Sequence, residues 1–275
     1  MAEDADGEFR GTERFAVLGR IGAGGMGVVY EVKDAESGRR VALKTLANLD
    51  GQALLRFKNE FRALADLSHP NLVSLGELLE VQGAWFFTME YVPGVDFMTY
   101  VCDRTGAAGD TISANGPTSG SAITLRGTPA ARPWTRAAPA EDAGPPHAFD
   151  EIRLRSALVQ LARGLAVLHA AGKVHRDIKP ANIRVTPEGQ VVLLDFGLVS
   201  DLAVDDRATD GHIVGTASYM APEQAASERV GPEADWYAVG VLLYEALVGR
   251  LPYTGSWLQV IMDKQMFQPP RPRAR

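Results

Sequence analysis

The chain has almost no cysteine: Cys102 is the single one among 275 residues. One thiol excludes a disulfide within the chain and offers no Cys-rich metal spacing. Long apolar runs are also missing, because the best stretch, residues 237–249, is too short to cross a membrane and contains Glu245. The first residues are acidic and lack a signal-peptide pattern. We expect a cytoplasmic location, which leaves open a membrane span outside this sequence.

An excess of positive charge is absent as well. The chain carries 28 Lys and Arg against 34 Asp and Glu, a net charge of −6. This balance argues against a general nucleic-acid or anionic-membrane surface. Hydrophobic residues make up 46% of the chain, so its length is enough to bury a sizeable core.

Large apolar side chains are scarce in one internal stretch, residues 104–148. Ala, Gly, Pro, Ser and Thr supply 32 of its 45 residues. Such a composition cannot bury enough apolar surface to offset chain entropy, so we expect a disordered loop between two helices. Trp134 and scattered arginines leave a docking role open, but a tolerated insertion without function is the simpler interpretation.

Two short motifs carry the clearest chemistry. Residues 175–182 read His-Arg-Asp-Ile-Lys-Pro-Ala-Asn, and residues 195–197 read Asp-Phe-Gly. Asp177 is suited to orient a hydroxyl, Lys179 to meet a phosphate and Asn182 to hold a metal, with Asp195 as a second metal ligand. Together, the motifs predict a phosphoryl-transfer site.

A glycine-rich loop lies upstream, at residues 21–29, with the pattern Gly-x-Gly-x-x-Gly-x-Val. Such a loop alone also fits a glycine-rich hairpin or the dinucleotide-binding turn that opens a helix. Both flanks are strand-like here, and no helical period follows, so the sequence predicts strand, loop and strand. Glycine lets the backbone approach phosphates closely.

A lysine in an apolar strand comes next, Lys44 in Val-Ala-Leu-Lys. Its ammonium group needs a partner, and Glu60 is the natural one. Glu60 lies beside the buried face of a predicted helix over residues 54–64, whose apolar side chains recur at three- and four-residue steps. The alternative is that Lys44 extends along a strand edge to solvent and Glu60 is solvated.

With these motifs in this order, the chain resembles the catalytic domain of a eukaryotic-type serine/threonine protein kinase, of the kind also found in bacteria. The resemblance covers roughly residues 12–270. It implies an α+β, bilobal protein-kinase fold: a small lobe at 12–91, with an antiparallel sheet and one key helix, and a larger, mainly helical lobe at 92–275. Residues 1–11 would be a flexible acidic N-terminus. ATP and Mg²⁺, with Mn²⁺ as an alternative, would bind between the lobes.

The resemblance also assigns roles. Lys44, positioned by Glu60, would contact the inner phosphates, Asp177 and Lys179 would act on the transferred group, and Asn182 and Asp195 would hold the metal. The other expected nucleotide-binding residues line the phosphates, adenine and ribose: Ile21, Gly22, Gly24, Gly27, Val29, Ala42, Met89, Glu90, Val92 and Asp96.

Residues 215–223 resemble the segment on which kinases dock their protein substrate, and Thr216 would bridge Asp177 and Lys179. An ordinary capped turn before a helix is the alternative. Arg176 would pair with a phosphate on Thr209, an expected autophosphorylation position in a homodimer. Alternatively, acidic residues of the same loop already engage Arg176.

Asp235 resembles a buried aspartate that braces the catalytic loop, followed by a helix whose near-continuous apolarity suits a position surrounded by protein. Two departures stand out. Arg184 falls where an apolar residue is expected beneath the adenine, so its stem would pack there while its guanidinium reaches solvent. The chain also stops at Arg275, before the helices that would give Glu223 an arginine partner.

Three functions fit these observations: an active protein serine/threonine kinase, an ATP-binding pseudokinase or scaffold, and a small-molecule phosphotransferase. The intact catalytic positions favour the first over the second, and the peptide-docking segment favours it over the third. Ala181 stands where many arginine-directed kinases carry a glutamate, which weakly indicates no preference for a basic residue just before the target.

Overall fold

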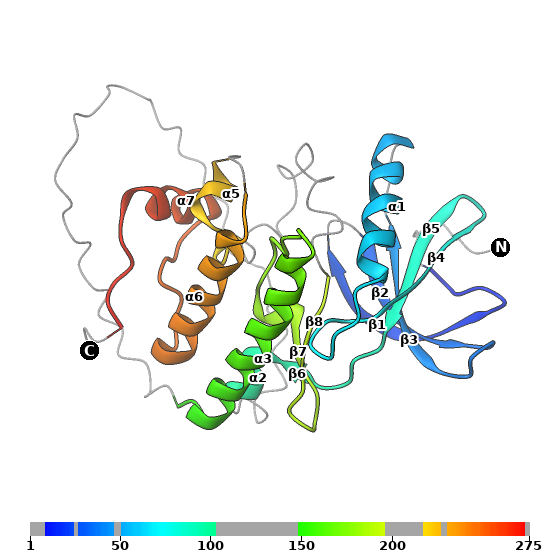
Figure 1. Ribbon diagram of the computed structural model, residues 1–275, viewed down its shortest axis with the longest axis horizontal. Helices are drawn as coiled ribbons and strands as arrows, with labels where there is room; N and C mark the ends of the chain where they lie inside the picture. The colour runs from blue at the N-terminus through cyan, green and yellow to red at the C-terminus, as the bar shows by residue number, and fades with distance from the viewer. Residues whose placement is uncertain are drawn as a thin grey trace, which may run out of the picture.

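A computed structural model describes residues 9–24, 27–46, 51–102, 148–195, 217–226 and 230–272. Figure 1 shows a sheet-rich part next to a mainly helical part, so the two-lobed α+β architecture expected from the sequence is confirmed. The expected loop at 104–148 lies outside the described residues apart from its last residue, Ala148. The predicted positions Thr209 and Thr216, later in the chain, also lie outside them.

The small lobe is a five-stranded sheet with the order β1-β2-β3-β5-β4, in which all neighbouring strands are antiparallel. Its strands are β1 (Phe15–Gly24), β2 (Gly27–Asp34), β3 (Arg40–Leu46), β4 (Leu75–Val81) and β5 (Ala84–Glu90). The helix α1 (Gly51–Ala65) connects β3 to β4. Lys44 therefore lies on β3, and Glu60 lies on α1, the next element along the chain.

Strands lie on both sides of the glycine-rich segment, as predicted, and the loop residues 25 and 26 between them lie outside the described residues. Gly22 pairs with Val29 across β1 and β2. Gly27 has φ 136°, and a Cβ there would lie 1.9 Å from the Thr45 carbonyl oxygen. Only glycine fits such a close approach of two backbones. At Gly22, by contrast, a Cβ would meet no atom within 4 Å.

Aromatic packing fixes α1 on the sheet. Phe57 and Phe61 of α1 are buried and contact Phe87 of β5 at ring centroid distances of 5.8 and 5.5 Å. These residues belong to a core that continues into the large lobe through Leu161 and Leu165. One apolar core thus joins α1 to the helices that support the catalytic loop.

The large lobe begins with β6 (Val95–Asp96) and α2 (Phe97–Val101), followed by α3 (Glu151–Ala170). A 3-10 turn, η2 (Pro180–Asn182), leads into β7 (Ile183–Val185) and β8 (Val191–Leu193), which form a small sheet with β6. The last elements are α5 (Pro222–Ala225), α6 (Glu233–Val248) and α7 (Trp257–Met266). The catalytic loop therefore runs from the end of α3 to η2.

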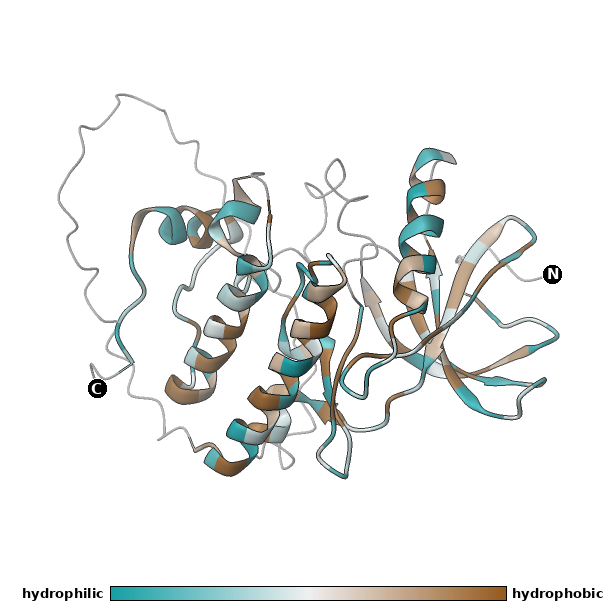
Figure 2. Ribbon diagram, in the orientation of Figure 1, coloured by the Kyte–Doolittle hydropathy of each residue, from teal (hydrophilic) through white to brown (hydrophobic). Residues whose placement is uncertain are grey.

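Helices α3 and α6 differ in how their apolar residues are distributed. Along α3, apolar and polar residues alternate in Figure 2, and its buried side includes Leu154, Leu161 and Leu168. In α6, the expectation of a helix surrounded by protein is only partly met, because Trp236 and Leu247 are 44% and 40% exposed in the structure as described. Within the described parts of the chain, no helix combines the length and apolarity needed to cross a membrane.

Candidate active site

Asp177 lies at the centre of a compact set of polar contacts. Its Oδ2 atom is 2.9 Å from Nζ of Lys179 and accepts a hydrogen bond of 2.9 Å from Nδ2 of Asn182. Asn182 also donates to the Asp177 carbonyl oxygen at 2.8 Å. Both contacts use Oδ2, and Oδ1 has no hydrogen-bond partner among the described residues. This free oxygen can accept a proton from a hydroxyl group.

The backbone before Asp177 is held in an unusual conformation. Arg176 has φ 65°, a left-handed value that costs free energy for a residue with a side chain. Its N–H donates to Oδ1 of Asp235 at 2.7 Å, and its carbonyl oxygen accepts from Nε2 of Gln224 at 2.9 Å. Contacts on both sides of the residue therefore maintain the strained turn that presents Asp177.

Asp235 is the buried brace that the sequence predicts. Its side chain is fully buried, and it accepts hydrogen bonds from the backbone N–H groups of His175 and Arg176 at 2.8 and 2.7 Å. His169 of α3 contacts the same carboxylate at 2.7 Å through Nε2. Helix α6 is thus tied to the catalytic loop and to α3 by a single carboxylate.

His175 connects the catalytic loop to the end of β8. Its Nδ1 accepts from the N–H of Asp177 at 3.3 Å, so Nε2 carries the proton and donates to the Leu194 carbonyl oxygen at 2.8 Å. Leu194 precedes Asp195, which has φ 54°. The two candidate aspartates are therefore positioned relative to each other through one buried imidazole.

Asp195 and Lys44 connect the two lobes. Nζ of Lys44 is 2.8 Å from Oδ2 of Asp195, and the lysine side chain is only 10% exposed. The contact bridges β3 of the small lobe and the segment after β8. A cation at this position suits the phosphates of a nucleoside triphosphate, and a carboxylate suits its metal ion.

Glu60 does not contact Lys44. Its Oε1 is 3.1 Å from Nζ of Lys173, a residue just beyond the end of α3. The prediction of a Lys44–Glu60 pair is therefore wrong for this conformation, because each partner is engaged elsewhere. Both side chains of the Lys173–Glu60 pair are nearly 30% exposed, so the pair contributes little stability.

The predicted adenine-side residues come together on β1, β2, β3 and β5. Ala42 of β3 pairs in register with Met89 of β5, and Val29 of β2 pairs with Lys44. Ala42, Met89 and Val92 are buried, Val29 is half-buried and Ile21 is exposed. The expected apolar wall and the cation that would meet the phosphates thus belong to one sheet.

Two predicted nucleotide residues have other contacts. The N–H of Glu90 donates to the Ser74 carbonyl oxygen at 2.9 Å, so it is not available to an adenine edge. Asp96 caps α2: one carboxylate oxygen accepts from the Thr99 N–H at 3.0 Å and the other from its hydroxyl at 2.6 Å. Each carboxylate oxygen can accept a second hydrogen bond, so a ribose contact at Asp96 stays a prediction.

Arg184 on β7 differs from the expectation. Its guanidinium donates a hydrogen bond to the Gly94 carbonyl oxygen instead of extending freely to solvent. Gly94 has φ 131°, and a Cβ there would lie 2.0 Å from the Val185 carbonyl oxygen. Arg184 therefore ties β7 to the segment between the lobes.

The predicted metal ligands fit a hard cation. Asn182 uses its Nδ2 for both of its contacts with Asp177, and Asp195 uses only Oδ2 for Lys44. Asn182 Oδ1 and Asp195 Oδ1 accept no hydrogen bond within the described ranges. Oxygen atoms of this kind are the ligands that Mg²⁺ takes, with the remainder supplied by water and phosphate. No group of three or more His, Cys, Asp or Glu side chains that could hold a metal is found in those ranges.

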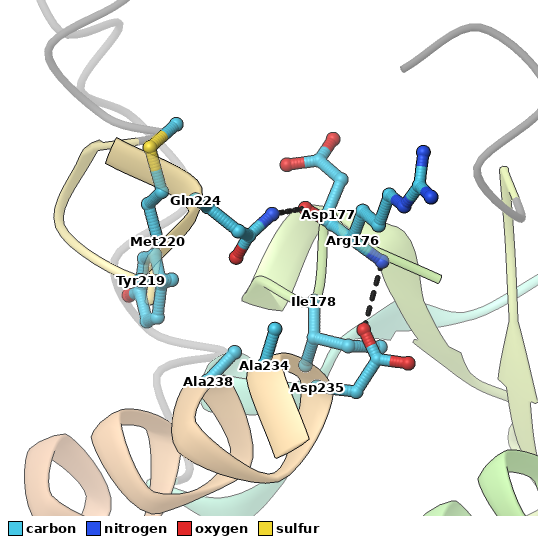
Figure 3. A pocket seen from close by; sticks show the side chains of 9 residues that line it. All are labelled: Arg176, Asp177, Ile178, Tyr219, Met220, Gln224, Ala234, Asp235 and Ala238. Carbon is cyan, nitrogen blue, oxygen red and sulfur yellow. Dashed lines mark hydrogen bonds between the residues drawn. The ribbon is translucent and has the colours of Figure 1, made fainter. Parts of the chain in front are cut away.

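The segment before α5 lies against the catalytic loop. Tyr219 and Met220 line a small pocket together with Asp177, as Figure 3 shows, and the Asp177 carboxylate points away from Asp235. Tyr219 donates its hydroxyl proton to Glu245 of α6. Glu223 forms no ion pair among the described residues.

Sequence reasoning missed two residues here. Gln224 accepts a hydrogen bond from the Ala221 N–H at 3.0 Å and donates one to the Arg176 carbonyl oxygen. Lys264 of α7 donates a hydrogen bond to the Ala217 carbonyl oxygen, in the segment before α5. Gln224 occupies the position of a capping-box glutamine, but Ala221 in place of Ser or Thr hides that pattern. For Lys264, the signal is its four-residue spacing from the buried Val260.

Comparisons with known proteins agree with this geometry. The family model described as protein tyrosine and serine/threonine kinase matches residues 15–272. Serine/threonine-protein kinase PknA of Mycobacterium tuberculosis is 34% identical over 267 residues, which are 94% of this chain and 52% of that protein. PknL of the same species is 35% identical over 246 residues, 88% of this chain and 51% of that protein. A probable serine/threonine-protein kinase PknB of Lactococcus lactis is 28% identical over 248 residues, with shares of 89% and 33%. The chain thus spans about half the length, or less, of the curated relatives it matches.

Proposed function

Because this chain belongs to the protein tyrosine and serine/threonine kinase family, we propose that it transfers the γ-phosphoryl group of ATP to serine and threonine hydroxyls of proteins. One observation carries the proposal: Asp177 is held by Lys179 and Asn182, and His175 connects it to the segment of Asp195, which is paired with Lys44. The serine/threonine preference rests on Lys179, two residues after Asp177, and on the names of the relatives.

In this mechanism the free Oδ1 of Asp177 accepts the hydroxyl proton as the substrate oxygen attacks the γ-phosphorus. The new O–P bond forms while the bond to the bridging oxygen breaks, and ADP leaves with that electron pair. Lys179 lies beside Asp177 to balance charge on the transferred group, and Lys44 meets the inner phosphates. A metal ion held by Asn182 and Asp195 would neutralise phosphate oxygens. Positioning and charge stabilisation account for most of such catalysis.

A nucleotide-binding scaffold is the second candidate. Arg184 falls where an apolar residue is expected beneath the adenine and binds the Gly94 carbonyl oxygen, and Glu60 is engaged by Lys173 instead of Lys44. Both features fit a weakened nucleotide pocket. The complete Asp177, Lys179 and Asn182 cluster favours the kinase.

The test of function is transfer of radiolabel from γ-labelled ATP, with magnesium, to the protein itself and to a panel of generic substrate proteins. We expect label on serine or threonine after acid hydrolysis, and none when a chelator removes the metal. Mapping the label by mass spectrometry tests Thr209, the proposed autophosphorylation position. Nucleotide binding without transfer to any protein would support the scaffold instead.

Substitutions at Glu60 and Lys173 separate two roles of the glutamate. If Glu60 serves Lys44 during turnover, Glu60→Gln should lower transfer about tenfold, whereas Lys173→Met, which removes only the observed partner, should not lower it. Both variants should stay within about 0.5 kcal/mol of the wild-type unfolding free energy, because the pair is partly exposed to solvent. Equal losses of activity in both variants would show that the Lys173–Glu60 pair itself is required.

A further inference from the structure

Lys264 is a buried cation with an unusual set of partners. It lies in the last turn of α7 and is 7% exposed. Its Nζ atom donates three hydrogen bonds, each 2.7 Å long, to the carbonyl oxygens of Ala217, Ser218 and Met220. The three protons of an ammonium group thus each find an acceptor in one short segment, residues 217–220.

No carboxylate balances this charge in the described structure. The titratable groups of the neighbouring elements are Glu223 of α5, Tyr237 of α6, Tyr253 before α7 and Asp263 of α7. Lys264 forms no ion pair with Glu223 or Asp263. Only the ring face of Tyr237 lies over the ammonium, 5.4 Å from its centroid. Burial lowers the pKa of Lys264 to about 8. A buried charge is retained only where hydrogen bonds compensate its lost hydration, so these carbonyls are specific partners.

The anchored segment has little structure of its own. Ala217 is helical, residues 218 and 219 form a turn, and Met220 has no regular secondary structure. Buried carbonyl groups without partners are costly, so Lys264 stabilises this shape by satisfying three of them at once. Tyr219, which lies between two of these carbonyls, is held separately by Glu245.

The same segment borders the reacting group. Tyr219 and Met220 share a pocket with Asp177, and Gln224 binds the backbone of Arg176. Residues 219 and 220 therefore border the space beside Asp177 to which a polypeptide would bring its hydroxyl. Their shape therefore bears on where that hydroxyl comes to rest.

We propose that Lys264 is a positioning residue for the protein substrate, which acts by holding residues 217–220 in the conformation that receives the polypeptide beside Asp177. This role rests on the proposed kinase function. Lys264 contacts neither the nucleotide-side residues nor Asp177, so its removal should affect recognition of the polypeptide and not of ATP.

The test compares Lys264→Met, which keeps the length of the side chain but has no donor, with wild type and with Lys33→Met, which removes the same charge from an exposed site on β2. The substrate is the protein that the wild type labels best. We expect Lys264→Met to raise KM for that substrate about tenfold, while kcat and KM for ATP change less than about twofold. Lys33→Met should match the wild type.

A pH series on the wild type provides a second arm that does not depend on how the variant folds. Above pH 8 the neutral amine has two protons for three carbonyls, so KM for the protein substrate should rise from pH 7 to 9 while KM for ATP stays level. In Lys264→Met the protein-substrate KM should stay level. A wild-type KM that is level across this range, or a folded Lys264→Met with wild-type KM, would overturn the role of Lys264 alone. No transfer by wild type to any protein would instead overturn the kinase function, and this inference with it.

Discussion

Replacing Asp177 with asparagine should lower the rate of phosphoryl transfer by about 10³-fold, within the range measured for loss of a general base. An amide cannot accept the hydroxyl proton, and Lys179 loses the carboxylate that lies 2.9 Å from its ammonium group. Nucleotide affinity should change less than about threefold, because Asp177 lies among the groups that would meet the hydroxyl. Single-turnover transfer of radiolabel and titration with a fluorescent ATP analogue measure the two effects.

The matched control for this substitution is Asp66→Asn, which removes an exposed carboxylate just after α1. It should retain wild-type transfer. Transfer by Asp177→Asn at more than about a tenth of the wild-type rate would exclude Asp177 as the group that receives the proton. Loss of nucleotide binding together with transfer would instead indicate a collapsed site.

Asp235→Ala should have the largest effect on stability, lowering the unfolding free energy by about 3–5 kcal/mol. The carboxylate is fully buried and accepts from two backbone N–H groups and from His169. Alanine leaves these donors without partners in a site too small to hydrate all of them. The left-handed turn at Arg176 also loses the hydrogen bond from its N–H to Asp235, so activity should fall with stability.

Urea denaturation followed by circular dichroism measures this change. Asp150→Ala is the control, since it removes a half-exposed helix cap from α3 and should cost only about 1 kcal/mol. A loss at Asp235 no larger than that at Asp150 would show that the catalytic loop keeps its shape without the carboxylate. The strained Arg176 turn would then have another support.

Sequence patterns predicted those parts of the fold in which local chemistry is decisive. The two strands at residues 15–24 and 27–34 follow from strand-like flanks and a glycine that must approach Thr45, and α1 follows from apolar side chains at helical spacing. Asp235 was also predicted, from its resemblance to the buried aspartate that braces the catalytic loop in this family. The spacing of Asp177, Lys179 and Asn182 within one loop made their contact foreseeable.

Pairings across long chain separations were harder to predict. Lys44 had two carboxylates within reach of its strand, and sequence cannot rank Glu60 against Asp195, which is 151 residues away. Lys173 was not considered as a partner for Glu60, and Arg184 was expected in solvent although it binds Gly94. Each of these choices depends on distances of a few ångströms that packing sets.

By itself the sequence determined the kinase family and the two-lobed architecture and predicted the catalytic groups, because these depend on residue types at short spacing. Only the tertiary structure decided which partner each charge takes: Lys44 with Asp195, Glu60 with Lys173, and Lys264 with three carbonyl oxygens. The physical reason is that electrostatic and hydrogen-bond energies fall steeply with distance and depend on burial. Neither the distance between two groups nor their burial can be read from the order of residues along the chain.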